Sequence, residues 1–180
     1  MRIKGLSLED FAILISDYLI KNGIDVVLSG GACVTIYTKN KFMSYDLDFV
    51  LISSDNQKAV KQLLGDIGFY EEDRYFKHND TEFFIDFVSP PLSLGQEPVK
   101  EISEIKKGGR VLKLLSPSDC VKDRLAAFYH WNDRQALEQA VLVCKEVEVD
   151  LKEVERWSTN EGMSDKYEKF IERLNETKTA

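Results

Sequence analysis

The chain has 180 residues, of which 43% are hydrophobic and 31% are charged, and its formal net charge is -7. This hydrophobic content is enough for a core, so the fold needs neither disulfides nor a structural metal. The negative charge argues against a general affinity for nucleic acid, although a local basic groove is still compatible with it. Three cysteines without a CxxC pair and two histidines argue against zinc sites and imidazole-rich metal sites.

The first predicted helix begins near the N-terminus. Ser7 and Asp10 form a helix N-cap pattern, apolar residues then recur at helical spacing, and Gly23 ends the helix. The next predicted elements are a strand at 24–28, a helix at 32–37, a strand at 46–53, a helix at 58–67, strands at 69–77 and 82–88 joined by a turn at 78–80, a loop at 90–95 and a strand at 111–115.

Strand signals almost vanish after Pro117. We predict a helix capped by Ser116 or Ser118 that runs to about Trp131, where the indole should be a packing anchor. Three more helices are expected, one capped by Asn132 or Asp133 and two at 151–158 and 164–174. The fold class is therefore α/β (α+β), with a small mixed sheet flanked by helices in residues 1–114 and a helical region in residues 115–180 that packs on it.

The N-terminal segment is basic and then apolar, which is also typical of a signal peptide. Glu9, Asp10 and Asp17 interrupt the apolar run, and no small-residue cleavage site follows it. No apolar stretch is long enough to span a bilayer. We therefore expect a cytoplasmic protein without membrane contact.

A Ser29-Gly30-Gly31 turn joins the first predicted strand to the second helix. Glycine lets the backbone approach a ligand closely, and the free N–H groups and dipole of a helix N-terminus favour phosphate. Ser29 and Thr35 could add hydroxyl donors. Many α/β turns contain two glycines, so this turn alone is weak evidence for a phosphate site.

Two aspartates, Asp46 and Asp48, begin the next strand with one leucine between them. Side chains alternate along a strand, so both carboxylates share one face about 6–7 Å apart, while Leu47 and Phe49 point into the core. The two carboxylates repel each other and lose solvation, and a cation would relieve both effects. Alternatively, Asp46 caps the start of the strand and Asp48 pairs with a nearby lysine.

A third aspartate, Asp86, stands within the apolar segment 83–88. A buried and unpaired carboxylate is costly, so Asp86 must be ion-paired, protonated or bound to metal. If its strand neighbours that of Asp46 and Asp48, the three carboxylates can hold two ions for phosphoryl or nucleotidyl transfer. Carboxylate ligands favour a hard ion such as Mg²⁺ or Mn²⁺.

In this order, the three motifs resemble those of the nucleotidyltransferase superfamily with a DNA polymerase beta-like palm. They are most similar to the small prokaryotic members, including the nucleotidyltransferase toxins of abortive-infection systems. The resemblance covers residues 24–90 by motif and extends more loosely into the helices after Pro117. It implies transfer of an NMP group from an NTP to an acceptor, which would be RNA, a protein or a small molecule, with release of pyrophosphate.

The resemblance also assigns residues. The implied catalytic and metal-binding residues are Asp46, Asp48 and Asp86, with Asp86 helping to deprotonate the attacking hydroxyl, and the implied nucleotide-binding residues are Ser29, Gly30, Gly31, Lys41, Ser44 and Lys122. The toxin-like members carry an arginine shortly before the first aspartate, and here only Lys39 or Lys41 could replace it. They also place a lysine and an aspartate on the later helices, for which Lys122, Asp123 and Asp133 are candidates.

Two alternatives stay open at this stage. Lys122, Asp123 and Arg124 would more commonly form a solvated helix face with local ion pairs than a phosphate contact. The whole chain could also be a nucleotide-binding module without turnover, or an interaction protein such as one half of a toxin–antitoxin pair with a protein partner.

Overall fold

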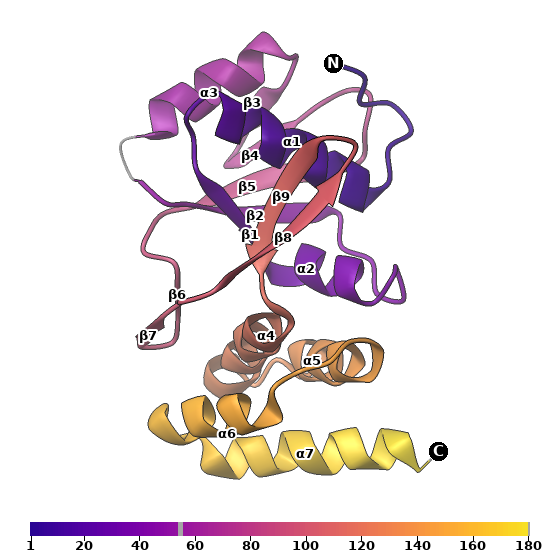
Figure 1. Ribbon diagram of the computed structural model, residues 1–180, viewed down its shortest axis with the longest axis vertical. Helices are drawn as coiled ribbons and strands as arrows, with labels where there is room; N and C mark the ends of the chain where they lie inside the picture. Colours follow the sequence, from indigo (N-terminus) through magenta and orange to yellow (C-terminus); the bar gives the residue numbers. More distant parts are fainter. Residues whose placement is uncertain (54–55, 180) are drawn as a thin grey trace.

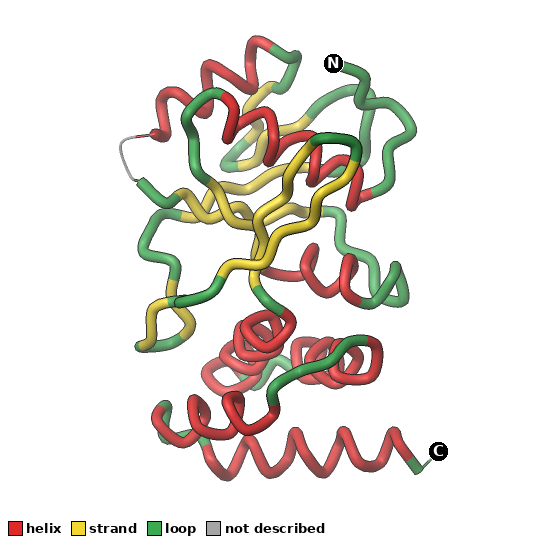
Figure 2. Tube along the Cα trace, in the orientation of Figure 1, coloured by secondary structure: helices red, strands yellow, loops and turns green. Residues whose placement is uncertain are grey.

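The computed structural model describes residues 1–53 and 56–179 (Figure 1; Figure 2). Its helices are α1 (Leu8–Lys21), α2 (Gly30–Tyr37), α3 (Gln57–Asp66), α4 (Pro117–Trp131), α5 (Arg134–Glu146), α6 (Leu151–Asn160) and α7 (Ser164–Lys178). Its strands are β1 (Val26–Ser29), β2 (Asp46–Leu51), β3 (Tyr70–Glu72), β4 (Tyr75–Lys77), β5 (Phe84–Val88), β6 (Ser93–Leu94), β7 (Glu97–Pro98), β8 (Ile102–Lys107) and β9 (Arg110–Leu115).

The described residues form a seven-stranded mixed sheet in the order β3-β4-β5-β2-β1-β9-β8. Strand β1 is antiparallel to β2 and parallel to β9, and β2 is parallel to β5. Because β1 and β9 run in the same direction, both end at the same edge of the sheet. The chain leaves that edge into α2 and α4, so the helical region lies beyond it (Figure 1).

Apolar side chains hold the first helix on the sheet. The hydroxyl of Ser7 accepts the N–H of Asp10 and caps α1, as the sequence predicts. Helix α1 packs against β1 and β9, and its fully buried Phe11 contacts the rings of Phe69 and Phe83. Leu47 and Phe49 of β2 belong to the same hydrophobic core as Phe11.

The helical region packs on the core through α4, which contacts β9, and through contacts of α4 and α5 with α2. Helix α2 is itself held to the end of β9, because the hydroxyl of Tyr37 donates to the carbonyl of Leu115 at 2.6 Å. The indole of Trp157, in α6, donates to the carbonyl of Leu94 at 3.1 Å and stacks on Tyr129. The α/β fold class and the four predicted C-terminal helices are therefore confirmed, while the division into two domains stays a prediction.

Three local predictions were wrong. The predicted strand at 69–77 is a hairpin of β3 and β4, because Asp73 turns the chain with a φ of 57°. The predicted loop at 90–95 contributes to the small β6–β7 ladder, and β8 was not predicted. Trp131 is 82% exposed and anchors nothing. None of the described helices has the length and apolar character needed to cross a bilayer.

Candidate active site

The three predicted aspartates come from two neighbouring parallel strands. Asp46 and Asp48 begin β2, and in the register of β2 with β5 Asp48 lies directly opposite Asp86. Leu47 and Phe49 are fully buried on the other face of β2, so the alternation predicted from the sequence is confirmed. The strand neighbourhood on which a three-carboxylate site depends is therefore present.

The glycine turn lies against these aspartates. Ser29 pairs with Asp48 in the β1–β2 ladder, so the next residue, Gly30, passes over the Asp48 side chain. Gly30 has a φ of 69°, and a Cβ built on it would overlap the Asp48 carboxylate. Both the backbone conformation and the lack of space therefore require glycine at this position.

The N-terminus of α2 retains its donors. Ser29 is the N-cap residue of α2, but in the described part of the chain its side chain accepts no capping hydrogen bond. The Ser29 hydroxyl instead donates to the carbonyl of Asp48 at 3.1 Å. The first N–H groups of α2 and the positive end of its dipole are thus directed toward the aspartate region, where they suit an anion.

A serine fixes the first aspartate. The Ser44 hydroxyl lies 2.5 Å from Oδ1 of Asp46 and 3.1 Å from the Asp46 carbonyl oxygen. The Ser44 backbone N–H donates to the Thr35 hydroxyl at 2.9 Å. Ser44 is only 7% exposed, so it orients the Asp46 carboxylate from the protein interior. The family resemblance places Ser44 in the nucleotide site, and the structure places its hydroxyl on the Asp46 carboxylate.

An arginine that the sequence analysis did not single out contacts the third aspartate. Nε of Arg74, in the turn between β3 and β4, lies 3.2 Å from Oδ2 of Asp86. The Arg74 side chain is 70% exposed and also lies over the ring of Tyr75. The buried Asp86 is thus ion-paired in this structure, which was one of the three states that the sequence left open.

Asp48 is the aspartate with an unbalanced charge. Burial is the largest of the effects that together raise the pKa of Asp48 to about 6; the nearby charges of Asp46 and Asp86 act in the same direction, and the charge of Arg124 acts in the opposite direction. A raised carboxyl pKa marks a place where negative charge lacks a close counter-ion. The oxygen donors and this deficit of positive charge fit a hard divalent cation.

The carboxylates are not yet arranged as a metal centre. Among residues 1–53 and 56–179, no group of three or more aspartate, glutamate, histidine or cysteine side chains is placed to hold an ion. Two of the three carboxylates have partners in this structure, since Ser44 contacts Asp46 and Arg74 contacts Asp86. Coordination by all three aspartates would require at least the Asp86 side chain to exchange its partner.

Comparison with known proteins identifies the fold. No protein-family model matches the sequence, and no curated protein matches it. An antigenic nucleotidyltransferase-like protein from Paracoccidioides brasiliensis superposes with a TM-score of 0.60 at 15% identity, over 78% of this chain and 77% of that chain. The chain has the nucleotidyltransferase fold.

Two further solved structures, both with a bound antibiotic or antibiotic derivative, share this nucleotidyltransferase fold. A lincosamide antibiotic adenylyltransferase with bound lincomycin gives a TM-score of 0.52 at 19% identity, over 77% of this chain and 98% of that chain. ANT(2″)-Ia in complex with adenylyl-2″-tobramycin gives a TM-score of 0.52 at 14% identity, over 92% of this chain and 96% of that chain. Similarity at this level establishes the fold and leaves the activity to be argued from the site.

The predicted cationic nucleotide ligands already have partners. Lys41 forms an ion pair with Glu146. Lys122 lies 2.9 Å from Glu153 and 3.2 Å from Asp119, so the local ion pairing expected on this helix face is confirmed. The expected solvation is wrong for this residue, which is only 6% exposed. Both lysines would have to leave these carboxylates to reach a phosphate.

Arg124 is a cation on α4 that acts on Asp48. Its guanidinium is held by the carboxylate of Asp123, at 2.5 Å, and by the side chain of Gln139. The charge of Arg124 lowers the pKa of Asp48, while the carboxylate of Asp123 raises it. Charged side chains on α4 therefore influence Asp48. The family resemblance likewise implies that charged residues on the later helices belong to the site.

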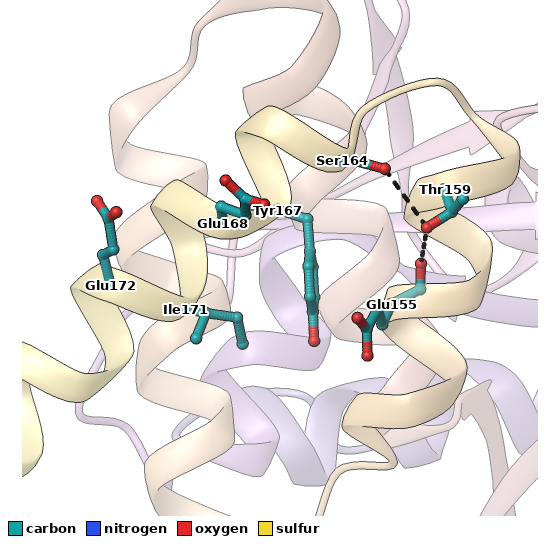
Figure 3. A pocket seen from close by; sticks show the side chains of 7 residues that line it. All are labelled: Glu155, Thr159, Ser164, Tyr167, Glu168, Ile171 and Glu172. Atoms are coloured by element: carbon teal, nitrogen blue, oxygen red, sulfur yellow. Dashed lines mark hydrogen bonds between the residues drawn. The ribbon is translucent and has the colours of Figure 1, made fainter.

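Hollows open on both sides of the aspartates. One of about 640 Å³ lies beside Asp46 and is lined by aromatic residues, including Tyr45 and Phe84. Another, of about 600 Å³, lies beside Asp86 and Arg74. A third, of about 370 Å³, lies between α6 and α7 in the helical region; Figure 3 shows the Tyr167 ring and three glutamates along it. None of the three aspartates lines this third hollow, whereas Asp46 also lines another hollow of about 450 Å³ together with Tyr75 and Phe84, so the hollows beside the aspartates are the ones relevant to the site.

Proposed function

We propose that this chain is a metal-dependent nucleotidyltransferase that moves an NMP group from an NTP to an acceptor. The observation that carries the proposal is the pairing of Asp48 with Asp86 on adjacent strands beneath the Gly30 turn. Acidic residues and a backbone anion site are thereby placed side by side. The proposal is supported by the nucleotidyltransferase fold, since two proteins that share it are an antibiotic adenylyltransferase and a protein bound to an adenylylated antibiotic.

The residues divide between phosphate and metal. The backbone N–H groups that follow Ser29 and Gly30 would hold the triphosphate at the N-terminus of α2. Asp46, Asp48 and Asp86 would hold Mg²⁺ or Mn²⁺ through their carboxylate oxygens. When bound, these ions supply positive charge that stabilises the developing negative charge on the phosphates.

The transfer is a substitution at the α-phosphorus of the NTP. The acceptor hydroxyl oxygen forms a bond to that phosphorus, and the bond to the bridging oxygen of the β-phosphate breaks. Pyrophosphate takes the electron pair of the broken bond, and the Asp86 carboxylate receives the hydroxyl proton. This role requires Asp86 to be free of Arg74, which holds it in the present structure.

Calorimetric titration of ATP, GTP, CTP and UTP with Mg²⁺ or Mn²⁺ tests the proposal. The wild type and Asp48→Asn should differ, because the variant keeps the shape of the side chain but loses one carboxylate charge. Asp80→Asn is the control, since Asp80 is an exposed aspartate in the turn before β5. We expect binding of at least one NTP that requires the metal, is lost in Asp48→Asn and is retained in Asp80→Asn.

Acceptor screening then separates an enzyme from a binding module. Protein that binds an NTP should release pyrophosphate when it is given RNA, protein or small-molecule acceptors. The absence of NTP binding by the wild type would refute a nucleotide site. Binding without pyrophosphate release from any acceptor would leave nucleotide binding as the function of this fold.

A further inference from the structure

Arg74 contacts one of the three aspartates from outside the sheet. Asp86 is 8% exposed, and a carboxylate buried in this way needs a positive partner. In this structure the partner is Arg74, whose Nε lies 3.2 Å from Oδ2. A side chain therefore supplies positive charge at the carboxylate that a divalent ion would use.

The three aspartate carboxylates therefore have different partners. Asp46 has the hydroxyl of Ser44, and Asp86 has the guanidinium of Arg74. Asp48 lies between these two carboxylates, and Arg124 on α4 acts on it only through its field. A cation that approaches from solvent therefore meets an open carboxylate at Asp48 and an engaged one at Asp86.

The position of Arg74 allows its ion pair with Asp86 to be exchanged. Arg74 belongs to a tight turn of an edge hairpin, and its side chain is 70% exposed. Only the arginine end of this ion pair is open to solvent, so water can solvate the guanidinium when it leaves, whereas the buried Asp86 then needs another cation in its place. The hollow of about 600 Å³ that Arg74 and Asp86 both line gives the guanidinium space to move without displacement of the sheet.

We infer that Arg74 is a positioning residue that competes with divalent metal for Asp86, so that the third aspartate enters the metal site only when Arg74 is displaced. This inference rests on the proposed function, since it concerns the same carboxylates. It adds an order to metal loading: Asp46 and Asp48 are available first, and Asp86 follows. The site would then be assembled in stages, with its third carboxylate withheld until Arg74 has left.

Binding of Mn²⁺ alone, measured by the EPR signal of the free ion, tests the competition without any turnover. Arg74→Gln should tighten Mn²⁺ binding by roughly fivefold or more, because a positive charge is removed from contact with a ligand. Lys61→Gln is the matched control. Lys61 lines the same hollow, is 67% exposed and pairs with Glu71 at 2.5 Å, so its loss changes the local charge equally but frees no proposed metal ligand. Arg74→Lys, which keeps the charge, should bind as the wild type does.

A double variant separates contact from general electrostatics. In an Asp86→Asn background, Arg74→Gln should have no further effect on Mn²⁺ affinity, since its target is already neutral. Equal effects of Arg74→Gln and Lys61→Gln, or no tightening by Arg74→Gln, would overturn the inference while Mn²⁺ binding that depends on Asp48 still supports the proposed function. If neither the wild type nor Arg74→Gln binds Mn²⁺, the proposed function fails together with this inference.

Discussion

Gly30 lies directly over the carboxylate of Asp48, with space for a hydrogen atom but none for a methyl group. The contact follows from the sheet register, because Ser29 pairs with Asp48 and the chain then turns into α2. One glycine therefore brings the helix N-terminus and the aspartate together. The phosphate site and the metal site of the proposed enzyme share this single point of approach.

Gly30→Ala should disrupt both folding stability and ligand binding. The positive φ of Gly30 costs any other residue about 1–2 kcal/mol, and the overlap with Asp48 should add about 1–3 kcal/mol. Gly162→Ala is a matched control, since Gly162 has a φ of 72° but no atom within 4 Å of an added Cβ. Denaturant unfolding should show a clearly larger loss for Gly30→Ala. Equal losses would mean that the close approach to Asp48 is not real.

The raised pKa of Asp48 predicts a pH dependence of stability. Because the pKa of Asp48 in the folded protein is raised to about 6, above the ordinary range of an aspartate, the folded protein binds a proton more tightly than the unfolded chain does. The metal-free protein should therefore gain stability as the pH falls from about 7 to about 4, by about 2–3 kcal/mol from this group.

Asp48→Asn isolates this contribution from that of the other carboxylates. The variant should be more stable than the wild type near neutral pH, and the difference should vanish at about pH 4. Thermal or urea unfolding at several pH values, without divalent metal, measures it. A variant that is less stable than the wild type at neutral pH would show that the Asp48 carboxylate is held by structural partners.

The aspartate strands illustrate what the sequence could predict. Alternation along residues 46–51 placed Asp46 and Asp48 on one face, because a period of two is a local property. Their proximity to Asp86 is set by strand order, which no local pattern encodes. That prediction came from the family resemblance alone, and the register of β2 with β5 confirms it.

The Arg74 contact shows where local patterns fail. The turn before it is made by Asp73 at a φ of 57°, and a single aspartate is a weaker turn signal than a glycine or proline. The segment therefore resembled one strand, and its arginine could not be placed. The buried Lys122 was missed for a related reason, because one of its two partners, Glu153, lies on a helix predicted separately.

Ser44→Ala should weaken metal binding without a large loss of stability. The Ser44 hydroxyl fixes the Asp46 carboxylate at 2.5 Å, and loss of a partner that orients a ligand typically costs about 10–100-fold in metal affinity. Mn²⁺ titration of Ser44→Ala and of Ser93→Ala, which removes an exposed hydroxyl on β6, measures the effect. Unchanged affinity in Ser44→Ala would remove Asp46 from the proposed metal site.

Substitution of the two tryptophans should affect stability to very different extents. Trp157 is fully buried, stacks on Tyr129 and donates to the Leu94 carbonyl, so it joins α6 to the β6–β7 hairpin. Trp157→Ala should therefore cost about 3–5 kcal/mol. Trp131 is 82% exposed, and Trp131→Ala should change stability by less than about 0.5 kcal/mol.

Urea unfolding followed by circular dichroism measures both tryptophan variants. If the helical region and the sheet unfold as one unit, the wild type shows a single transition and Trp157→Ala moves that transition as a whole. Because α4 carries the Arg124 charge that acts on Asp48, such coupling would make the site depend on the packing of the helical region. Two separate transitions in the wild type, with only one moved by Trp157→Ala, would show instead that the helical region is a domain that folds by itself.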